Sequence, residues 1–350
     1  MTQARKKQIN YAVTRSYNLT GRCVRRAYLA GVDELTGKNH DYRRDWIIIR
    51  IKQLATVFSV DIASYAIMSN HYHLVVKVNV KQANSWTSRE VVEQRELLYK
   101  THPLVEQYLN SGNLSKPEKE RANAIISQYR TQLASISEYM KALNEFIARK
   151  ANKEDGCTGH FWESRFKSQA VLDDVSVLAT MVYADLNPIR AKMADTPEGS
   201  DFTSIQERIR EHQGNPVVYQ LPEEEQENDP LKGIKQAKLL PFAGAPHIDN
   251  DPHHLQHELV SYICLVEWTG RLIKEGKRGK IPSDLPPILQ RLNITAENWL
   301  EFSYGGFKND FHAAIGNDEA LTEFKHKTFR QYVKDTKAAR QFYKPAELSQ

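Results

Sequence analysis

Apolar and polar residues follow short, distinct periods along the first eighty residues of this 350-residue chain. Alternation over residues 9–17 predicts a strand, with Arg15 projecting from one of its faces. Apolar residues recur at helical spacing over residues 42–58 and predict a helix, although three isoleucines in succession retain some strand character. Two β-rich runs, 60–67 and 72–80, flank a polar turn and predict an antiparallel hairpin.

The middle of the chain changes to helical periodicity. Residues 88–150 predict two or three helices, with a break at Ser111-Gly112-Asn113 and a new start where Pro117 suits a first helical turn. Residues 161–172 predict a further strand. Asp173 and Asp174 can cap the helix that follows, which should stop at Asn187-Pro188.

Beyond residue 213 the periodic apolar pattern weakens and proline becomes frequent, so residues 214–254 predict a linker. Amphipathic patterns then return and predict a small helical domain over residues 255–350, whose role the pattern does not indicate. We therefore expect an α+β domain at 1–213 with a helical insertion at about 88–150, the linker, and the helical C-terminal domain.

The composition is that of a water-soluble globular protein, with 41% hydrophobic and 26% charged residues. No apolar run approaches the ~20 residues that cross a bilayer, and the polar, basic start does not resemble a secretory signal, so we expect a cytoplasmic protein that is not in a membrane. The three cysteines are far apart and odd in number, which argues against a disulfide framework or a cysteine-based zinc site.

Positive charge is concentrated at the start of the chain. The net charge is +5, and residues 1–60 hold twelve Lys and Arg residues against four acids. Such an end suits a polyanion such as nucleic acid. A solvated surface balanced by acids elsewhere explains the same charge equally well.

His71 and His73 are the first candidates for a chemical site. Residues two apart on a strand face the same side, so both imidazoles can bind one cation. With 12 histidines, however, chance alone supplies about 0.4 such pairs, and paired imidazoles on a half-buried strand commonly form ordinary hydrogen bonds. A second group, His253, His254 and His257, lies at the linker edge and is better explained as solvated histidines.

Three ordered segments add a more specific signal. Residues 68–76 (MSNHYHLVV) resemble the His-hydrophobic-His segment of the HUH single-tyrosine transposases, in particular the REP-associated tyrosine transposases. Residues 159–168 (GHFWESRFKS) and 183–191 (YADLNPIRA) resemble that branch's second and third signature segments, in the same order. The resemblance spans residues 11–205 and does not extend to the remainder of the chain.

The resemblance implies an antiparallel sheet of the ferredoxin or RNA-recognition type with flanking helices, the His pair on a central strand and the tyrosine on a following helix. It implies that Tyr183 is the nucleophile and that His71, His73 and Asn187 bind the metal, Mg²⁺ or Mn²⁺, although imidazole ligands also suit Zn²⁺, Co²⁺ or Ni²⁺. Without the resemblance, Asn187 is better explained as a helix cap before Pro188, and Tyr183 as a packed aromatic residue.

The same resemblance implies single-stranded or hairpin DNA as the partner, and a possible homodimer. Basic residues near the first strand and the second signature segment suit DNA phosphates, and an aromatic residue suits unpaired bases. These DNA-binding candidates are Arg15, Arg22, Arg25, Arg26, Trp162, Arg165 and Lys167. We expect Phe161 and Phe166 to pack in the core, and Lys274, Lys277, Arg278 and Lys280 to bind duplex DNA or simply to form a solvated loop.

The resulting hypothesis is a metal-dependent endonuclease and strand transferase that acts through a 5′-phosphotyrosine intermediate. A phenol is a weak nucleophile, so the metal would have to polarise the phosphate for transesterification. Two alternatives stay open. The chain could be a domesticated protein that binds DNA hairpins without cutting them, or a metal-dependent nuclease that activates water while Tyr183 merely packs.

Overall fold

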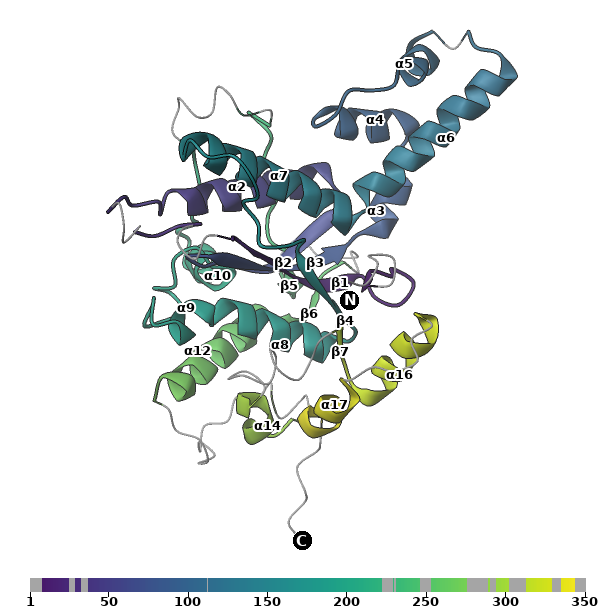
Figure 1. The fold of residues 1–350 in the computed structure, drawn as a ribbon. Coiled ribbons are helices and arrows are strands. Elements are labelled where there is room, and N and C mark those ends of the chain that lie inside the picture. Colours follow the sequence, from purple (N-terminus) through teal and green to yellow (C-terminus); the bar gives the residue numbers. More distant parts are fainter. Residues whose placement is uncertain are drawn as a thin grey trace.

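The structure is a computed structural model with α+β architecture (Figure 1). It describes residues 8–24, 29–32, 37–111, 113–221, 229, 231–245, 253–275, 289, 294–301, 313–328 and 335–343.

A five-stranded sheet forms the centre of the fold, with strand order β2-β3-β1-β4-β7. The strands are β1 (Ser16–Arg22), β2 (Val60–Ile67), β3 (His71–Val78), β4 (Lys167–Val171) and β7 (Ala314–Ile315). The first four pair antiparallel with their neighbours, whereas β7 pairs parallel with β4. The expectation of a purely antiparallel sheet is therefore wrong at this edge, because a short segment of the C-terminal region adds to it.

Helices cover both faces of the sheet (Figure 1). Helices α2 (Arg43–Val57) and α7 (Ile136–Glu154) pack together on one face, and α8 (Asp174–Asp185) packs on β2 and β3 from the other. The helix predicted over residues 42–58 is confirmed as α2, and most of its residues are buried, the charged Arg43, Arg50 and Lys52 included. A side chain on this sheet therefore faces either the layer of α2 and α7 or the layer that contains α8.

Helices lie between β3 and β4, where the sequence predicted a helical insertion. Besides α7 they are α3 (Val80–Ser85), α4 (Ser88–Glu96), α5 (Pro103–Asn110) and α6 (Lys116–Leu133), so α4 to α7 occupy the range for which two or three helices were predicted. Helix α7 packs on α2, whereas α4, α5 and α6 project from the core (Figure 1). A reciprocal capping box starts α4, in which Glu90 N donates to Thr87 Oγ1 and Thr87 N donates to the Glu90 carboxylate. At the start of α6, the amide and the hydroxyl of Ser115 both donate to the Glu118 carboxylate. The break near residues 111–113 and the helix start near 115–117 are confirmed.

The first strand and the strand before α8 are shorter than predicted. Strand β1 runs over Ser16–Arg22 rather than 9–17, because the segment before it forms a turn. In this turn the side-chain oxygen Oδ1 of Asn10 accepts a hydrogen bond from Ala12 N at 3.0 Å. Strand β4 begins at Lys167 rather than 161. The residues just before β4 join β1 only through an isolated bridge between Cys23 and Trp162.

Residues after 203 remain packed against the sheet and α8. Helix α10 (Ser204–His212) contacts β2, and the short strands β5 (Phe242–Ala243) and β6 (Leu255–Glu258) lead into α12 (Leu259–Glu275), which packs on α8 and on α9 (Asn187–Arg190). Further on are α14 (Ala296–Glu301), α16 (Asp318–Lys327) and α17 (Thr336–Phe342). The predicted division at 214–254 and 255–350 stays a prediction, but the described residues on both sides of it share one hydrophobic core.

None of the helices in the described part of the chain is long and apolar enough to cross a membrane.

Candidate active site

Side-chain alternation along β3 divides its residues between the two faces of the sheet. Tyr72 points to the α2 and α7 face, where its hydroxyl donates to Asn144 Oδ1 of α7 at 2.6 Å. His71 and His73 therefore point to the opposite face, toward α8. In the antiparallel register between β1 and β3, Arg22 pairs with His71 and Thr20 pairs with His73.

Tyr183 of α8 lies against this His pair. The ring centroids of His73 and Tyr183 are 5.5 Å apart with their planes at 86°, and those of His71 and His73 are 5.1 Å apart at 81°. His73 is 7% exposed and Tyr183 is 6% exposed, whereas His71 is half-buried. The fold thus brings together three residues that the sequence had assigned to one site, and His71 forms its open side.

The two imidazoles fit a divalent cation. His71 Nδ1 lies 2.6 Å from Asn70 Oδ1, and His73 Nδ1 lies 3.4 Å from Thr20 Oγ1. Partners on Nδ1 fix the orientation of a histidine that binds metal through its other nitrogen, so Nε2 is the atom through which each ring would bind. Sequence reasoning did not identify Asn70 or Thr20 in this role. Asn70 lies in the segment 68–76, whereas Thr20 lies outside the three segments.

Asn187 occupies the first position of α9, one turn beyond Tyr183. Its Nδ2 donates to the backbone carbonyls of Tyr183 at 2.8 Å and Ala184 at 3.3 Å. Nδ2 is therefore used to cap the end of α8, and Oδ1 is the atom that would bind a cation. The capping function and the ligand function anticipated for Asn187 are therefore compatible in one orientation.

Arg190 was not identified from the sequence as a site residue. Its guanidinium carbon lies 4.6 Å from the centroid of the Tyr183 ring. Arg190 ends the same short α9 that begins with Asn187. Its place beside Tyr183 depends on the path of the chain after Pro188, which the sequence pattern did not predict. A guanidinium there can stabilise negative charge on a phenol or on a phosphate beside it.

A buried carboxylate fixes the end of the tyrosine helix. Asp185 is fully buried and accepts hydrogen bonds from Ser204 Oγ at 2.5 Å, Ile205 N at 3.1 Å and the hydroxyl of Tyr262. Burial raises the pKa of Asp185 to about 6, and the hydrogen bonds from Ser204 and Tyr262 oppose that rise. Asp185 therefore connects α8 to both α10 and α12.

Two of the DNA-binding candidates lie on the same face as the His pair. The register places Thr20 between His73 and Lys167, and Arg22 opposite His71, and residues directly paired across strands point to the same side. Both cations are exposed. They therefore form a basic edge beside His71.

The remaining candidates lie elsewhere. Arg165 is exposed and precedes β4, and Arg15 is exposed at the end of β1 farthest from Arg22. Trp162 is half-buried: its indole N–H donates to Asn144 O at 2.8 Å and its ring packs edge-on against Tyr72. Arg25 and Arg26 lie outside the described residues, as do Lys277, Arg278, Lys280 and the side chain of Lys274.

Two other histidine clusters do not compete with this site. The expectation of a solvated histidine is wrong for His253, which is half-buried and lies 2.5 Å from an oxygen of Asp61 on β2. Within the described ranges, His40, Glu154 and Asp155 also gather ligand atoms within 4.8 Å of one another. The buried guanidinium of Arg43 already bonds both of those carboxylates, so this cluster is an ion-pair network at the ends of α2 and α7.

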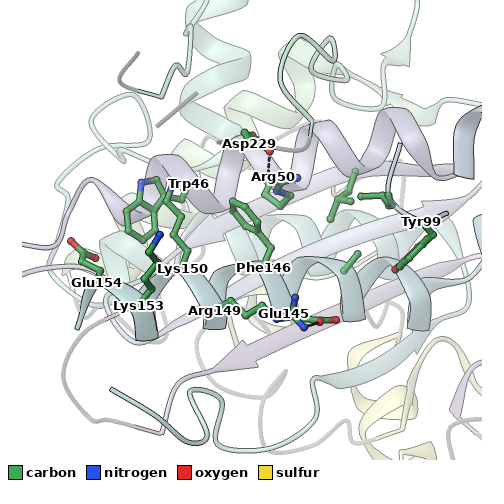
Figure 2. A pocket seen from close by; sticks show the side chains of 13 residues that line it. Trp46, Arg50, Tyr99, Glu145, Phe146, Arg149, Lys150, Lys153, Glu154 and Asp229 are labelled. Carbon is green, nitrogen blue, oxygen red and sulfur yellow. Dashed lines mark hydrogen bonds and ion pairs between the residues drawn. The ribbon is translucent and has the colours of Figure 1, made fainter. Parts of the chain in front are cut away.

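A groove of about 740 Å³ lies between α2 and α7, on the side of the sheet opposite Tyr183 (Figure 2). Two of its cations contact aromatic rings across the groove. Arg50 pairs with Asp229 at 2.5 Å and lies 3.5 Å from the ring centroid of Phe146, and Lys150 lies over Trp46 at 4.2 Å. The two ring contacts join α7 to α2.

No protein-family model matches the chain, and no curated protein matches its sequence. Among solved structures, the chain is similar to one described as "Structure of the REP associates tyrosine transposase bound to a REP hairpin". The sequence identity is 11% and the TM-score 0.36, over 64% of this chain and 93% of that chain. A likeness of this size gives no information about activity.

Proposed function

We propose that this protein is a metal-dependent endonuclease and strand transferase that acts on single-stranded or hairpin DNA with Tyr183 as its nucleophile. The observation that carries the proposal is the contact between Tyr183 and His73, with His71 beside them. If Tyr183 only packed for stability, there would be no reason for two histidines with oriented rings to lie beside its phenol ring. The resemblance of the three segments 68–76, 159–168 and 183–191 to the HUH single-tyrosine transposases supports the same assignment.

The arrangement of secondary structure also supports membership of the HUH class. Strand β1, helix α2, strands β2 and β3, helix α7 and strand β4 follow one another as βαββαβ, and these four strands have the order β2-β3-β1-β4. This order supports the ferredoxin-like arrangement that the resemblance implies, with the His pair on the interior strand β3. The parallel strand β7 is an addition at the β4 edge.

His71, His73 and Asn187 would hold the cation, which we propose is Mg²⁺ or Mn²⁺. When bound, a divalent cation polarises a non-bridging phosphate oxygen and orients the phosphodiester for in-line attack. The choice between the two ions follows from the resemblance, since imidazole nitrogens alone would favour softer metals. Thr20 and Asn70 orient the two rings on which binding depends.

In the proposed reaction, Tyr183 would attack the phosphorus atom of a phosphodiester bound beside the His pair. A bond forms between its phenolic oxygen and phosphorus, the bond from phosphorus to the 3′ oxygen of the preceding nucleotide breaks, and the released 3′ oxygen takes up a proton. The phenol loses its own proton in the same step, and Arg190 over the ring offsets the charge that results. Reversal of this transesterification by a different 3′-hydroxyl joins a new end without ATP.

Access to the reacting atoms is from one side. His73 and Tyr183 are buried, whereas His71, Asn187 and Arg190 are half-buried. A DNA backbone would therefore approach over these three residues, beside the exposed cations Arg22 and Lys167. Backbone phosphates on that edge would hold the strand in place without reading its sequence.

The test is incubation of the purified full chain with a library of end-labelled DNA hairpins carrying single-stranded flanks, with Mn²⁺ or with a chelator. We expect cleavage in Mn²⁺ together with a covalent adduct that mass spectrometry maps to Tyr183. Tyr183→Phe should abolish cleavage and leave hairpin affinity unchanged, and Tyr108→Phe, in the insertion, is a matched control that should retain cleavage.

Two results would replace the proposal with its alternatives. Hairpin binding that persists in chelator, with no cleavage by the unmodified protein on any flank, identifies a DNA-binding protein without nuclease activity. Metal-dependent cleavage that survives Tyr183→Phe and leaves no adduct identifies a nuclease that uses water.

A further inference from the structure

The tyrosine helix α8 is held at both ends by residues of the C-terminal region, whose role the sequence pattern does not indicate. At its C-terminal end, the hydroxyl of Tyr262 on α12 donates to the carboxylate of Asp185. Both side chains are fully buried, and Asp185 is two residues from Tyr183. Hydrogen bonds to a buried carboxylate are among the stronger contacts in a protein interior, so this one fixes the helix end.

Helix α12 approaches this end closely at Gly270. A Cβ atom at Gly270 would lie 3.1 Å from Leu186 Cδ2 and 3.6 Å from Ile189 Cδ1. The glycine thus lets α12 lie directly on the turn between α8 and α9, which also carries Asn187. Contact at this turn restrains both Tyr183 and the proposed metal ligand that follows it.

The N-terminal end of α8 is held in a similar way. Asp173 caps the helix by accepting from Ser176 N at 2.7 Å, and the same carboxylate accepts from Asn317 N at 2.9 Å and from the hydroxyl of Tyr343 at 2.9 Å. Tyr343 Oη also lies 2.6 Å from Ser176 Oγ. The cap is therefore shared between α8 and the segment that contains β7, α16 and α17.

We propose that the C-terminal region is a clamp on the tyrosine helix, in which Tyr262 and Tyr343 are positioning residues that keep Tyr183 facing His73. The inference rests on the proposed function and deepens it. A covalent nucleophile must lie close to in-line geometry, and a displacement of about 1 Å can cost about 100-fold in rate. Neither tyrosine of the clamp lies at the His pair, so neither is a catalytic residue.

The clamp has a specific kinetic signature. Removing the hydroxyl of Tyr262 or Tyr343 should leave the basic edge at Arg22 and Lys167 intact, so the affinity for a DNA hairpin should not change. The rate of the covalent step at saturating DNA should fall, because α8 gains freedom to move. A merely destabilised protein would instead lose active molecules without changing the rate per active molecule.

The experiment measures single-turnover cleavage at saturating labelled hairpin, hairpin Kd, and amide hydrogen exchange of α8 in the full chain. The variants are Tyr262→Phe, Tyr343→Phe and, as a matched control, Tyr139→Phe. Tyr139 is a fully buried tyrosine on α7 whose hydroxyl donates to Ile51 O at 2.8 Å on the other face of the sheet. The control loses one buried hydrogen bond of the same kind, without touching α8.

We expect Tyr262→Phe to slow cleavage by about 10-fold or more, since part of a ~100-fold positioning effect is lost, with Kd within about twofold of the unmodified protein. Exchange in α8 should accelerate for Tyr262→Phe and Tyr343→Phe and stay unchanged for Tyr139→Phe. A double variant, Tyr262→Phe with Asp185→Asn, should be no slower than the slower single variant, because both act through one contact.

The clamp is overturned if Tyr139→Phe slows cleavage as much as Tyr262→Phe, or if α8 exchange is unchanged in both clamp variants. Failure of the proposed function looks different. If the unmodified protein forms no adduct and cuts no hairpin, Tyr183 is not a nucleophile, and the exchange of α8 alone decides whether the C-terminal region holds this helix.

Discussion

The ring of Tyr183 lies edge-on to the imidazole of His73, with 5.5 Å between their centroids, although the two residues belong to segments far apart in the sequence. The whole helical insertion α3–α7 separates these segments along the chain. The contact forms because β3 is central in the sheet and α8 packs directly on β2 and β3. Both partners of the proposed chemistry are therefore supplied by one copy of the chain.

This geometry predicts that Tyr183 acts on the metal site of its own chain. Neither His73→Ala nor Tyr183→Phe should cleave DNA alone, and an equimolar mixture of the two proteins should not cleave it either. The mixture is incubated with labelled hairpin and Mn²⁺ and compared with each variant mixed with unmodified protein. Recovery of cleavage in the mixture of the two inactive variants would mean that the tyrosine reaches a partner's site.

Arg190 should contribute to the rate through its position over the Tyr183 ring, 4.6 Å from guanidinium carbon to centroid. Arg190→Ala removes a preorganised positive charge, and losing one such donor typically costs about 100- to 1,000-fold in rate. Arg190→Lys should recover part of that loss, since the charge returns without the planar guanidinium. Single-turnover cleavage rates measure both.

The control for Arg190 is Arg149→Ala, on the exposed side of α7 beyond the opposite face of the sheet. Its cleavage rate should match that of the unmodified protein. Equal losses in the two variants would show that overall positive charge, rather than the contact with Tyr183, sets the rate.

Much of the site could be predicted because its residues lie in short segments with strong local patterns. The hairpin at β2 and β3 followed from two β-rich runs around a polar turn, and the alternation then fixed His71 and His73 to one face. The cap at Asp173 and the stop near Pro188 bracketed the helix that carries Tyr183. Local chemistry determines these features, and it is visible in the sequence.

The features that were missed depend on contacts between distant segments. Arg190 reaches Tyr183 only because the chain turns after Leu186 into α9. Strand β7 is two residues long and has no recognisable period, yet it joins β4 through the fold of the C-terminal region. Tyr262 and Asp185 are ordinary helical residues until α12 is placed on α8.

The start of α6 should depend on pH through its capping box. The hydroxyl and the amide of Ser115 both donate to Glu118, which holds the pKa of Glu118 below its ordinary value of 4.5. A depressed pKa in the folded state means that the cap stabilises above the ordinary value and is lost as pH falls through the lowered one. Amide exchange in the first turn of α6 should therefore accelerate once acidification passes below the ordinary value of 4.5.

Glu118→Gln should remove most of that pH dependence, and Glu120→Gln, an exposed glutamate on the same helix, should retain it. Exchange that accelerates equally in both variants would mean that general acid unfolding, rather than the cap, is being measured.

Gly21 in β1 should not tolerate a side chain, because Tyr72 occupies the space beside it. A Cβ atom at Gly21 would lie 2.6 Å from Cε1 and Cζ of the Tyr72 ring, which is fully buried and hydrogen-bonded to Asn144. Overpacking of this kind typically costs about 1–3 kcal/mol, so Gly21→Ala should lower the free energy of unfolding by that amount in urea titrations. In a Tyr72→Leu background the clashing atoms are absent, and the same substitution should cost much less. Equal costs in the two backgrounds would show that the ring of Tyr72 is not the reason for the glycine, and that the strand itself requires it.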